Sequence, residues 1–522
     1  MQSTLSHLSG YSDHPVAQNH RKKIILLQPR CGKYDLYICD LPISLIYVAS
    51  VLQSKKYDVV IIDQRVQKDW KTRLLTELRT DPLLVGITVM TGEPIKYALK
   101  LSQIIKNVCD VPVVWGGIHP TILPEQTIQN DNIDFVVRGK GEYALFHLAH
   151  ALENGGSTNN IPGLVFKDKS GLIYSNETDT FDWTNLPAPP YHLVDHAQYF
   201  RSGFGNKVIS IMTSRNCPHR CTFCYNSSLA TTEKWISEPI ERTQAILIML
   251  VEKYRPNYIS FIDDDFFVVP ERAKSILNFL IQKKWDISIG FRGARVDELM
   301  RLDDSVLGLL VKANTRHINI GVESGSETIL KRLVKRITPE MVLALNRRLS
   351  KYESLIPLYN FFSGIPGETE EDIRKSTELI LRLIDDNPQC QISGYHQYTP
   401  YPGSALYEEA IHHGFREPTT LETWNQMRLE TNSKNCPWID RRRRRLLNTI
   451  YTCVYFVDRK YEVYFLNQGI VQKVLYPLVR LYRPFARFRL KHLFSTFPLE
   501  IYLKDFFYFI AEIKTRLFGL RT

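Results

Sequence analysis

Short apolar segments that alternate with amphipathic segments constrain the fold of this chain more than any other feature. Between residues 22 and 155, runs such as DVVIID and VPVVWGG are separated by segments whose apolar residues recur at helical spacing. Strands that alternate with helices predict a parallel, doubly wound sheet, which binds ligands at the carboxyl ends of its strands. We therefore predict an α/β domain over residues 22–155, preceded by a tail at 1–21.

A second alternating region covers residues 205–430. Its six strand-like segments run from KVISIMTS at 207–214 to ISGYHQYTPYPG at 392–403. Such βα units predict a partial βα barrel with its active site at the carboxyl ends of the strands. The stretch 156–204 contains a hairpin signal and a Pro-rich sequence typical of a linker. Residues 431–522 are predicted to form a helical C-terminal extension.

The composition is that of a folded protein with several domains. Of the 522 residues, 44% are hydrophobic and 23% are charged. No uncharged apolar run reaches the roughly 18 to 20 residues that span a bilayer, and the polar start MQSTLSHLSG lacks the layout of a secretory signal. The nine cysteines do not form a disulfide-type pattern. A cytoplasmic location is therefore expected.

Three cysteines follow the first strand of the second region, in the sequence CPHRCTFC: Cys217, Cys221 and Cys224. A structural zinc site normally takes four protein ligands, and Cys390 and Cys436 lie far away in the sequence. A four-iron cluster held by three cysteines keeps one iron free to bind a substrate or cofactor. The pattern favours such a cluster, with zinc or inert buried thiols as the alternatives.

Glycines stand at the ends of several predicted strands of the first region, as in Gly116-Gly117 and in GKGE at 139–142. Glycine lets the backbone approach a large flat or phosphorylated ligand, although tight turns alone would also explain it. No GxGxxG follows the first strand, which argues against a standard dinucleotide site.

The second region resembles the radical S-adenosylmethionine (SAM) superfamily, in which CxxxCxxC follows the first barrel strand and an aromatic residue, here Phe223, precedes the last cysteine. The resemblance implies that the three cysteines hold a catalytic four-iron four-sulfur cluster whose free iron binds SAM. Cleavage of SAM then gives a 5′-deoxyadenosyl radical. Two of the expected SAM contacts have structural alternatives. Asp263 could cap a helix, and Gly364 could form only a turn in GIPGE. The implied SAM contacts are Phe223, Asp263, Asp264, Arg295, Glu323, Ser324 and Gly364.

The first region is similar to the cobalamin-binding domain that precedes the barrel in cobalamin-dependent radical SAM enzymes. The similar segments are LPISLIYVASVL, VVWGGIHPTILPEQ and DFVVRGKGE. Because the sequence lacks DxHxxG, cobalamin is expected to bind without a histidine ligand to cobalt. Lys140 stands where the family usually has Glu, which alters the local charge. A scaffold without cobalamin is the alternative. The implied cobalamin contacts are Thr88, Gly116, Gly117, His119, Gly139, Gly141 and Glu142.

Together the two resemblances imply an enzyme that methylates an unactivated carbon of a hydrophobic or natural-product-like substrate. One SAM molecule would methylate cobalamin and a second would generate the radical, with both centres held close together. Radical cyclisation or rearrangement without methyl transfer is one alternative, and a non-catalytic iron-sulfur protein is another. The expected partners are a small-molecule or lipid substrate and an electron donor such as flavodoxin or ferredoxin.

The C-terminal region is basic and aromatic. Residues 473–522 contain ten Lys or Arg and three Asp or Glu, which contributes +7 to the net charge of +11. The region would either dock on the barrel or contact an anionic membrane, at the inner face of the cell membrane, as a basic amphipathic anchor. The apolar stripe of this anchor comprises Phe506, Ile510, Ile513, Leu517 and Leu520.

Five consecutive arginines occupy residues 441–445. A solvated helix face is the simplest interpretation of this run, and an anion-binding site is the alternative. Because no nucleic-acid-binding fold accompanies the basic patches, we expect no nucleic acid partner.

Overall fold

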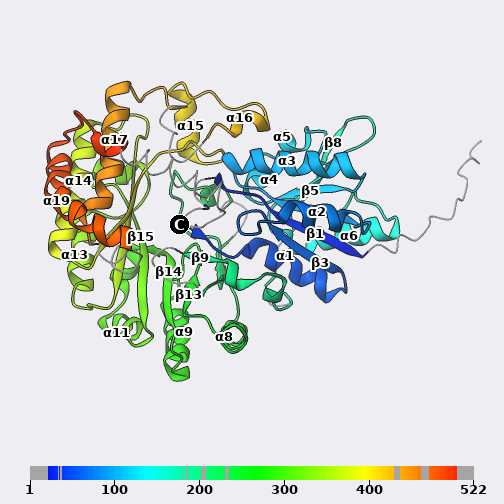
Figure 1. Ribbon diagram of the computed structural model, residues 1–522, viewed down its shortest axis with the longest axis horizontal. Coiled ribbons are helices and arrows are strands. Elements are labelled where there is room, and N and C mark those ends of the chain that lie inside the picture. Colours follow the sequence, from blue (N-terminus) through cyan, green and yellow to red (C-terminus); the bar gives the residue numbers. More distant parts are fainter. Residues whose placement is uncertain are drawn as a thin grey trace, which may run out of the picture.

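The computed structural model describes a parallel sheet, a partial βα barrel beside it, and a helical C-terminal extension (Figure 1). This arrangement confirms the predicted fold class. The described residues are 22–32, 35, 38–179, 182–183, 186–201, 207–229, 234–427, 435–459 and 470–502.

The N-terminal sheet has the strand order β3-β1-β4-β5-β6-β7-β8. Its first five strands pair in parallel, and the β7–β8 hairpin, from the stretch predicted as a linker, adds two antiparallel strands at one edge. The strand order reverses at β1, because β3 is added on one side of β1 and β4 on the other. Doubly wound sheets bind ligands at such a switch point, here between β1 and β4. The strands are β1 (Lys23–Gln28), β3 (Asp58–Asp63), β4 (Leu84–Thr88), β5 (Val113–Gly116), β6 (Phe135–Val137), β7 (Leu164–Lys167) and β8 (Ile173–Ser175).

Helices cover both faces of this sheet, which explains its nearly continuous apolar strands. In β1, Ile24 and Leu26 pack into the core beneath α1 and α6, whereas Ile25 and Leu27 pack into the core beneath α2 and α3. The helices are α1 (Ile43–Ser54), α2 (Trp70–Leu78), α3 (Glu93–Val108), α4 (Ile118–Ile122), α5 (Pro124–Ile128) and α6 (Gly141–Asn154).

The barrel has six strands, and each neighbouring pair is parallel. Its strands are β10 (Val208–Ile211), β13 (Tyr258–Phe261), β14 (Ser288–Arg295), β15 (Thr315–Glu323), β16 (Ile356–Ser363) and β17 (Gln391–Gln397). Its helices are α7 (Asn226–Leu229), α8 (Ile240–Tyr254), α9 (Pro270–Lys283), α10 (Val296–Arg301), α11 (Asp304–Lys312), α12 (Glu327–Arg332), α13 (Pro339–Leu349), α14 (Glu370–Asp386) and α15 (Ala405–His412). Two small antiparallel pairs complete the sheets: β2 (Ile38–Cys39) with β9 (Phe200–Arg201), and β11 (Ser214–Arg215) with β12 (Ile236–Ser237).

Hydrogen bonds join the sheet domain to the barrel. Trp424 in α16 (Leu421–Trp424) donates from Nε1 to Oε1 of Gln126, at 2.6 Å. Gln126 in turn donates from Nε2 to the carbonyl oxygen of Pro418, at 3.0 Å. On β14, Arg292 donates from Nη1 to Oδ2 of Asp40, at 2.6 Å. These contacts fix the sheet domain against the carboxyl ends of the barrel strands.

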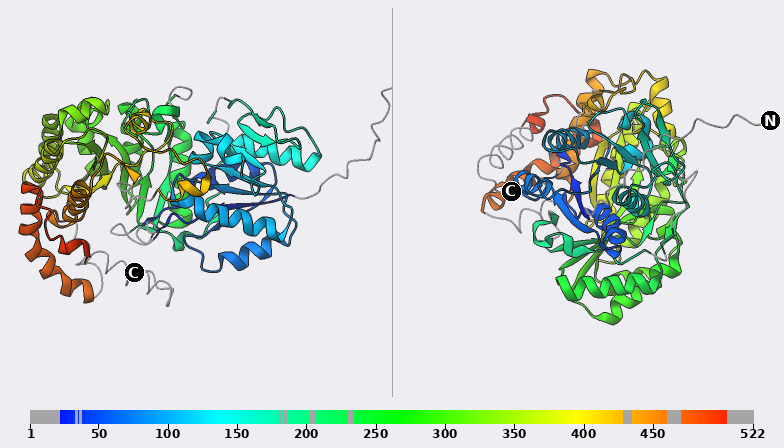
Figure 2. Two further views of the ribbon diagram at one scale, coloured as in Figure 1. Left: turned by 90° about the horizontal axis from the view of Figure 1, so that it is seen from above. Right: turned by 90° about the vertical axis from the view of Figure 1, so that its right-hand side faces the viewer.

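The C-terminal helices α17 (Arg441–Val457) and α19 (Ile470–His492) lie on the side of the barrel away from the N-terminal sheet (Figure 2). In α17, Asn448 accepts a hydrogen bond from Gln397 at the end of β17, at 2.6 Å. Arg441, Arg442 and Arg445 are exposed in the first turns of α17, and Asp440 caps the helix. The predicted stripe from Phe506 to Leu520 lies outside the described residues. Within the described residues no helix is both long and apolar enough to cross a bilayer.

Candidate active site

The three cysteines lie on one loop between the carboxyl end of β10 and α7. The amide of Cys224 donates to the carbonyl oxygen of Cys221, at 3.1 Å. All three thiols are free, as are the other six cysteines of the chain. Burial raises the pKa of Cys217 above its usual range and the pKa of Cys224 to about 11, with a further increase from neighbouring thiols. Such close, partly enclosed thiols lose their protons when a metal binds, which fits the proposed cluster.

Two buried cations lie beside this loop. Arg295, at the end of β14, donates from Nη1 to Sγ of Cys221, at 3.3 Å. Arg295 also donates from Nη2 to the carbonyl oxygen of Lys335, at 2.6 Å. The Lys335 ammonium lies 5.9 Å from the ring centre of Phe223 and donates to Oε1 of Glu323, at 2.8 Å. Asp297 also pairs with Arg295, at 2.9 Å, so the two cations would offset only part of the negative charge of cluster thiolates.

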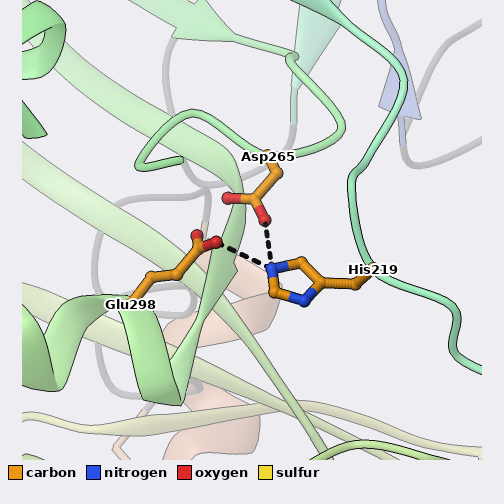
Figure 3. Close-up of side chains that lie close together, drawn as sticks. All are labelled: His219, Asp265 and Glu298. Atoms are coloured by element: carbon orange, nitrogen blue, oxygen red, sulfur yellow. Dashed lines mark hydrogen bonds and ion pairs between the residues drawn. The ribbon is translucent and has the colours of Figure 1, made fainter. Parts of the chain in front are cut away.

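Two acidic side chains lie around His219 of the loop (Figure 3). His219 Nε2 is 2.8 Å from Oε1 of Glu298 and 3.7 Å from Oδ2 of Asp265. The same Asp265 oxygen is 3.9 Å from Sγ of Cys217. Burial, together with the neighbouring Glu298, raises the pKa of Asp265 to about 9. These groups could hold a cation, but their mutual hydrogen bonds already anchor the cysteine loop to β13 and α10.

Asp263 and Asp264 hold the start of the cysteine loop. Oδ1 of Asp263 accepts from the amide and hydroxyl of Thr213, at 3.1 and 2.8 Å, and from the hydroxyl of Ser214, at 2.5 Å. Oδ2 of Asp264 accepts from the amide of Asn216, at 3.0 Å. The structure thus places both aspartates next to the loop, in positions that orient its backbone.

Among the described residues, Ser324 and Gly364 form hydrogen bonds within the barrel and not with the cysteines. Ser324 is fully buried, and its hydroxyl is 3.1 Å from the hydroxyl of Ser376 in α14. Gly364 has a φ of 91°, which favours glycine, and its amide donates to Oε2 of Glu368, at 2.6 Å. The structure therefore brings Phe223, Arg295 and Glu323 to the cysteines. The SAM roles of these three residues, like those of the two aspartates, Ser324 and Gly364, stay predictions.

The predicted cobalamin residues gather at the carboxyl ends of β4, β5 and β6. Thr88 and Gly116 are register partners in adjacent strands. Gly117 has a φ of 96°, and a Cβ atom there would lie 2.9 Å from the amide nitrogen and carbonyl oxygen of Val89. Gly139 has a φ of 69°, and Gly141 begins α6. The close contact with Val89 requires glycine at position 117. At Gly116 the nearest atom to an added Cβ is 3.7 Å away, so the backbone there is open at the ligand edge of the sheet, which fits a large planar cofactor.

His119 and Glu142 form contacts inside the protein. His119 is fully buried, its Nδ1 is 3.2 Å from the hydroxyl of Thr91, and its ring packs edge-on against Trp424. Burial lowers the pKa of His119 to about 3, so its imidazole is neutral at ordinary pH. Glu142 accepts from Nη2 of Arg215, at 2.5 Å. The cobalamin roles of these two residues and of the other predicted contacts stay predictions.

Several residues of the site were not predicted from the sequence. Lys335 was missed because a lysine in the basic segment KRLVKR is typical of a solvated surface. His219 and Asp265 lie within CPHRC and DDD, the two motifs that pointed to this region. Neither motif indicates that these two side chains contact each other. Glu298 has no local signal, because only the fold brings α10 to the cysteine loop.

Comparison with known proteins agrees with this geometry. Residues 211–380 match the family model of the radical SAM superfamily, and residues 39–149 match that of the B12 binding domain. An uncharacterized methyltransferase of Pyrococcus horikoshii is 32% identical over 375 residues, which cover 71% of this chain and 78% of the relative.

The chain belongs to the radical SAM superfamily. It is an enzyme with a B12-binding domain, and the predicted cofactors, a four-iron four-sulfur cluster, SAM and cobalamin, are confirmed.

Two further similarities extend over most of this radical SAM enzyme. The anaerobic magnesium-protoporphyrin IX monomethyl ester cyclase of Rubrivivax gelatinosus is 25% identical, covering 70% of this chain and 66% of the cyclase. The cobalamin-dependent radical SAM enzyme OxsB, solved with aqua-cobalamin and SAM, has a TM-score of 0.69 at 18% identity. The alignment covers 96% of this chain and 76% of OxsB. At that identity the likeness supports the fold, including the C-terminal extension.

Proposed function

We propose that this radical SAM enzyme methylates an unactivated carbon of a small hydrophobic or natural-product-like molecule. The P. horikoshii relative is named a methyltransferase, and both domains that such a reaction needs are present in one chain. When bound, SAM and the cluster supply a hydrogen-abstracting radical, and cobalamin supplies a transferable methyl group.

A contact between the two ligand loops carries this proposal. Glu142 lies in the first turn of α6, next to the Gly139 and Gly141 loop, and Arg215 lies two residues before Cys217. The ion pair between them, at 2.5 Å, is nearly enclosed. Because the carboxyl ends of both sheets meet at this point, a substrate between them would be near the radical source and the methyl source together.

The chain's own residues would perform binding and orientation. Cys217, Cys221 and Cys224 would hold the cluster, with Arg295 and Lys335 offsetting part of its charge. The glycine loops at Gly117 and Gly139 would receive cobalamin. The packing of the buried His119 ring against Trp424 would keep the sheet domain closed against the barrel and exclude water from the space between them.

The test is anaerobic purification from cells supplied with cobalamin, followed by analysis of the SAM products. We expect about four irons and one cobalamin per chain, and formation of both 5′-deoxyadenosine and S-adenosylhomocysteine. Formation of 5′-deoxyadenosine alone would favour cyclisation or rearrangement, the type of reaction named for the R. gelatinosus relative. Absence of 5′-deoxyadenosine with an intact reduced cluster would contradict radical catalysis.

We further propose that the C-terminal extension contacts an anionic membrane. Seven of the fourteen large apolar side chains that are exposed in the described structure lie between residues 481 and 502. Leu481 is 76% exposed and Phe497 is 86% exposed, and the basic residues Arg480 and Lys491 are exposed beside them. Aromatic and basic side chains together suit a lipid headgroup region, which would favour a hydrophobic substrate.

Point substitutions test this contact better than removal of residues 473–522, because α19 also packs Ala486 and Leu490 into the core. We expect Leu481→Ser with Phe497→Ser to lower sedimentation with phosphatidylglycerol vesicles. The matched control is Val108→Ser with Leu172→Ser, which alters two exposed apolar residues of the sheet domain. Equal sedimentation of both variants and the wild type would contradict membrane contact.

A further inference from the structure

Basic side chains lie around the outer surface of the cysteine loop. Arg220, between Cys217 and Cys221, is exposed. Lys331 is 79% exposed at the end of α12, and Arg336 is exposed just beyond it. The surface formed by Arg220, Lys331 and Arg336, here called the basic rim, borders the cysteine loop, in which Cys217 and Cys224 are partly exposed.

Specific contacts fix the segment that carries the basic rim to the cysteine loop. Thr222 donates from its amide to the carbonyl oxygen of Leu333, at 3.2 Å, and from its hydroxyl to that of Arg332, at 3.1 Å. The following residues alternate between outside and inside: Val334 is 37% exposed, Lys335 is buried against Phe223, and Arg336 is exposed.

The backbone enforces this alternation. Val334 has a φ of 52° and Arg336 a φ of 58°, both in the left-handed region that a side chain bearing Cβ rarely adopts. The end of α12 holds this turn, because the amide of Val334 donates to the carbonyl oxygen of Lys331 and the amide of Lys335 to that of Leu330, both at 3.0 Å. The bonds to Thr222 then fix the turn beside the cysteine loop. The turn places one cation inside, at the cluster, and leaves an apolar residue and a second cation on the surface above it.

The basic rim has little compensating negative charge. Lys331 approaches Glu327 at 3.6 Å, but both side chains are largely exposed, so the pair is weak. Arg220 and Arg336 have no carboxylate partner in the part of the chain that the structure describes. Cations that are not paired within their own chain favour an acidic partner.

We propose that the basic rim is the docking surface for an acidic one-electron carrier protein, of the flavodoxin or ferredoxin type. This inference rests on the proposed function, because each radical-forming turnover requires one electron at the cluster. The reduced carrier loses one electron and the oxidised cluster gains it, with no further reactant. Complementary charge steers the carrier to the loop, and the exposed Val334 and Tyr225 provide apolar contact beside it.

The test uses the variant Arg220→Glu/Lys331→Glu/Arg336→Glu, with reduced flavodoxin as the probe. We expect the Kd for flavodoxin, measured by titration at low ionic strength, to rise about tenfold or more. The rate of flavodoxin-driven SAM cleavage should fall similarly, whereas cleavage driven by excess dithionite should match the wild type. Arg301 is left unchanged because it approaches Glu298, which binds His219.

The matched control is Lys253→Glu/Lys283→Glu/Lys312→Glu. These exposed lysines lie at the carboxyl-terminal ends of α8, α9 and α11, at the opposite end of the barrel, and their reversal makes the same change in net charge. The control should keep the wild-type Kd. Equal weakening of both variants would mean that net charge alone attracts the carrier, which would overturn the proposal.

Two further measurements keep the outcome clear. Lys331→Glu/Arg336→Glu leaves the cysteine loop unaltered and should still weaken binding if the triple variant loses its cluster. The wild-type Kd should rise steeply with salt, because exposed charges are screened beyond about 8 Å at 0.15 M. An unchanged Kd in the double variant would overturn the docking surface. Failure of the wild type to cleave SAM with dithionite would instead overturn the proposed function.

Discussion

Arg215 and Glu142 form a nearly enclosed ion pair that joins the two ligand-binding loops of this protein. The Arg215 guanidinium also lies 4.7 Å from the ring centre of Trp183 and 5.3 Å from that of Tyr47. Removing one partner would leave a buried charge unpaired, which lowers the free energy of unfolding by about 3 kcal/mol or more. We therefore expect Arg215→Ala to lower the free energy of unfolding by that amount, as measured by urea denaturation.

The exposed pair of Arg347 and Asp386 is the control for this prediction. Arg347→Ala should cost at most about 1 kcal/mol, because solvent screens the charges. The variant Arg215→Ala/Glu142→Gln should be less destabilised than the sum of its single changes, since neither charge is then left alone. Additive effects would mean that the two side chains do not interact energetically.

Cys217→Ala should abolish the cluster and with it the formation of 5′-deoxyadenosine. The loop supplies three thiolate ligands, and the two that remain in this variant are too few to hold a four-iron cluster. Iron content, visible absorption and product analysis measure this outcome. Cys109→Ser, at the end of α3 in the sheet domain, should keep the wild-type iron content. Retention of about four irons by Cys217→Ala would exclude Cys217 as a ligand.

Lys335→Met should make the cluster harder to reduce. Lys335 is buried, and it interacts electrostatically with Cys221. Because an added electron is stabilised by nearby positive charge, its removal should shift the midpoint potential to a more negative value. An EPR-monitored redox titration with mediators measures the shift. Lys331→Met, at an exposed position nearby, should leave the potential unchanged; equal potentials in all three proteins would refute the role of Lys335.

Glu368 should make the stability of the protein pH-dependent. Burial raises the pKa of Glu368 from 4.5 to about 7 in the folded chain. The folded state therefore binds more protons than the unfolded state between these values. The stabilisation is full below pH 4.5 and falls by about 3 kcal/mol as the pH rises through 7.

Glu368→Gln should remove this part of the pH dependence. The amide does not titrate, so the difference between the unfolding free energies at pH 5 and pH 8 should shrink relative to the wild type. Glu353→Gln, at an exposed turn position, should keep the wild-type difference. An unaltered difference in Glu368→Gln would show that Glu368 is ionised throughout this range.

The sequence indicated the two sheets because strand and helix periodicity is a local property. DVVIID corresponds to β3 at 58–63 residue for residue, and each predicted barrel segment overlaps one of the six strands. The pairing of β7 and β8 with the N-terminal sheet was not predicted. Their stretch carries turn and Pro-rich signals, and only the free edge of β6 determines that the hairpin joins the sheet.

The sequence alone identified the three cysteines as candidate ligands and the glycines as the residues of the strand ends. Ligand spacing and positive φ angles depend only on a few adjacent residues. Only the tertiary structure decided the surroundings of the cysteines. Lysine, glutamate and arginine usually lie at protein surfaces. Lys335 and Glu298 are buried, and Arg215 is nearly enclosed, because elements that are distant in the chain cover them. Charge and burial act through space, so their effects on the site became definite only when the sheet domain and the barrel were brought together.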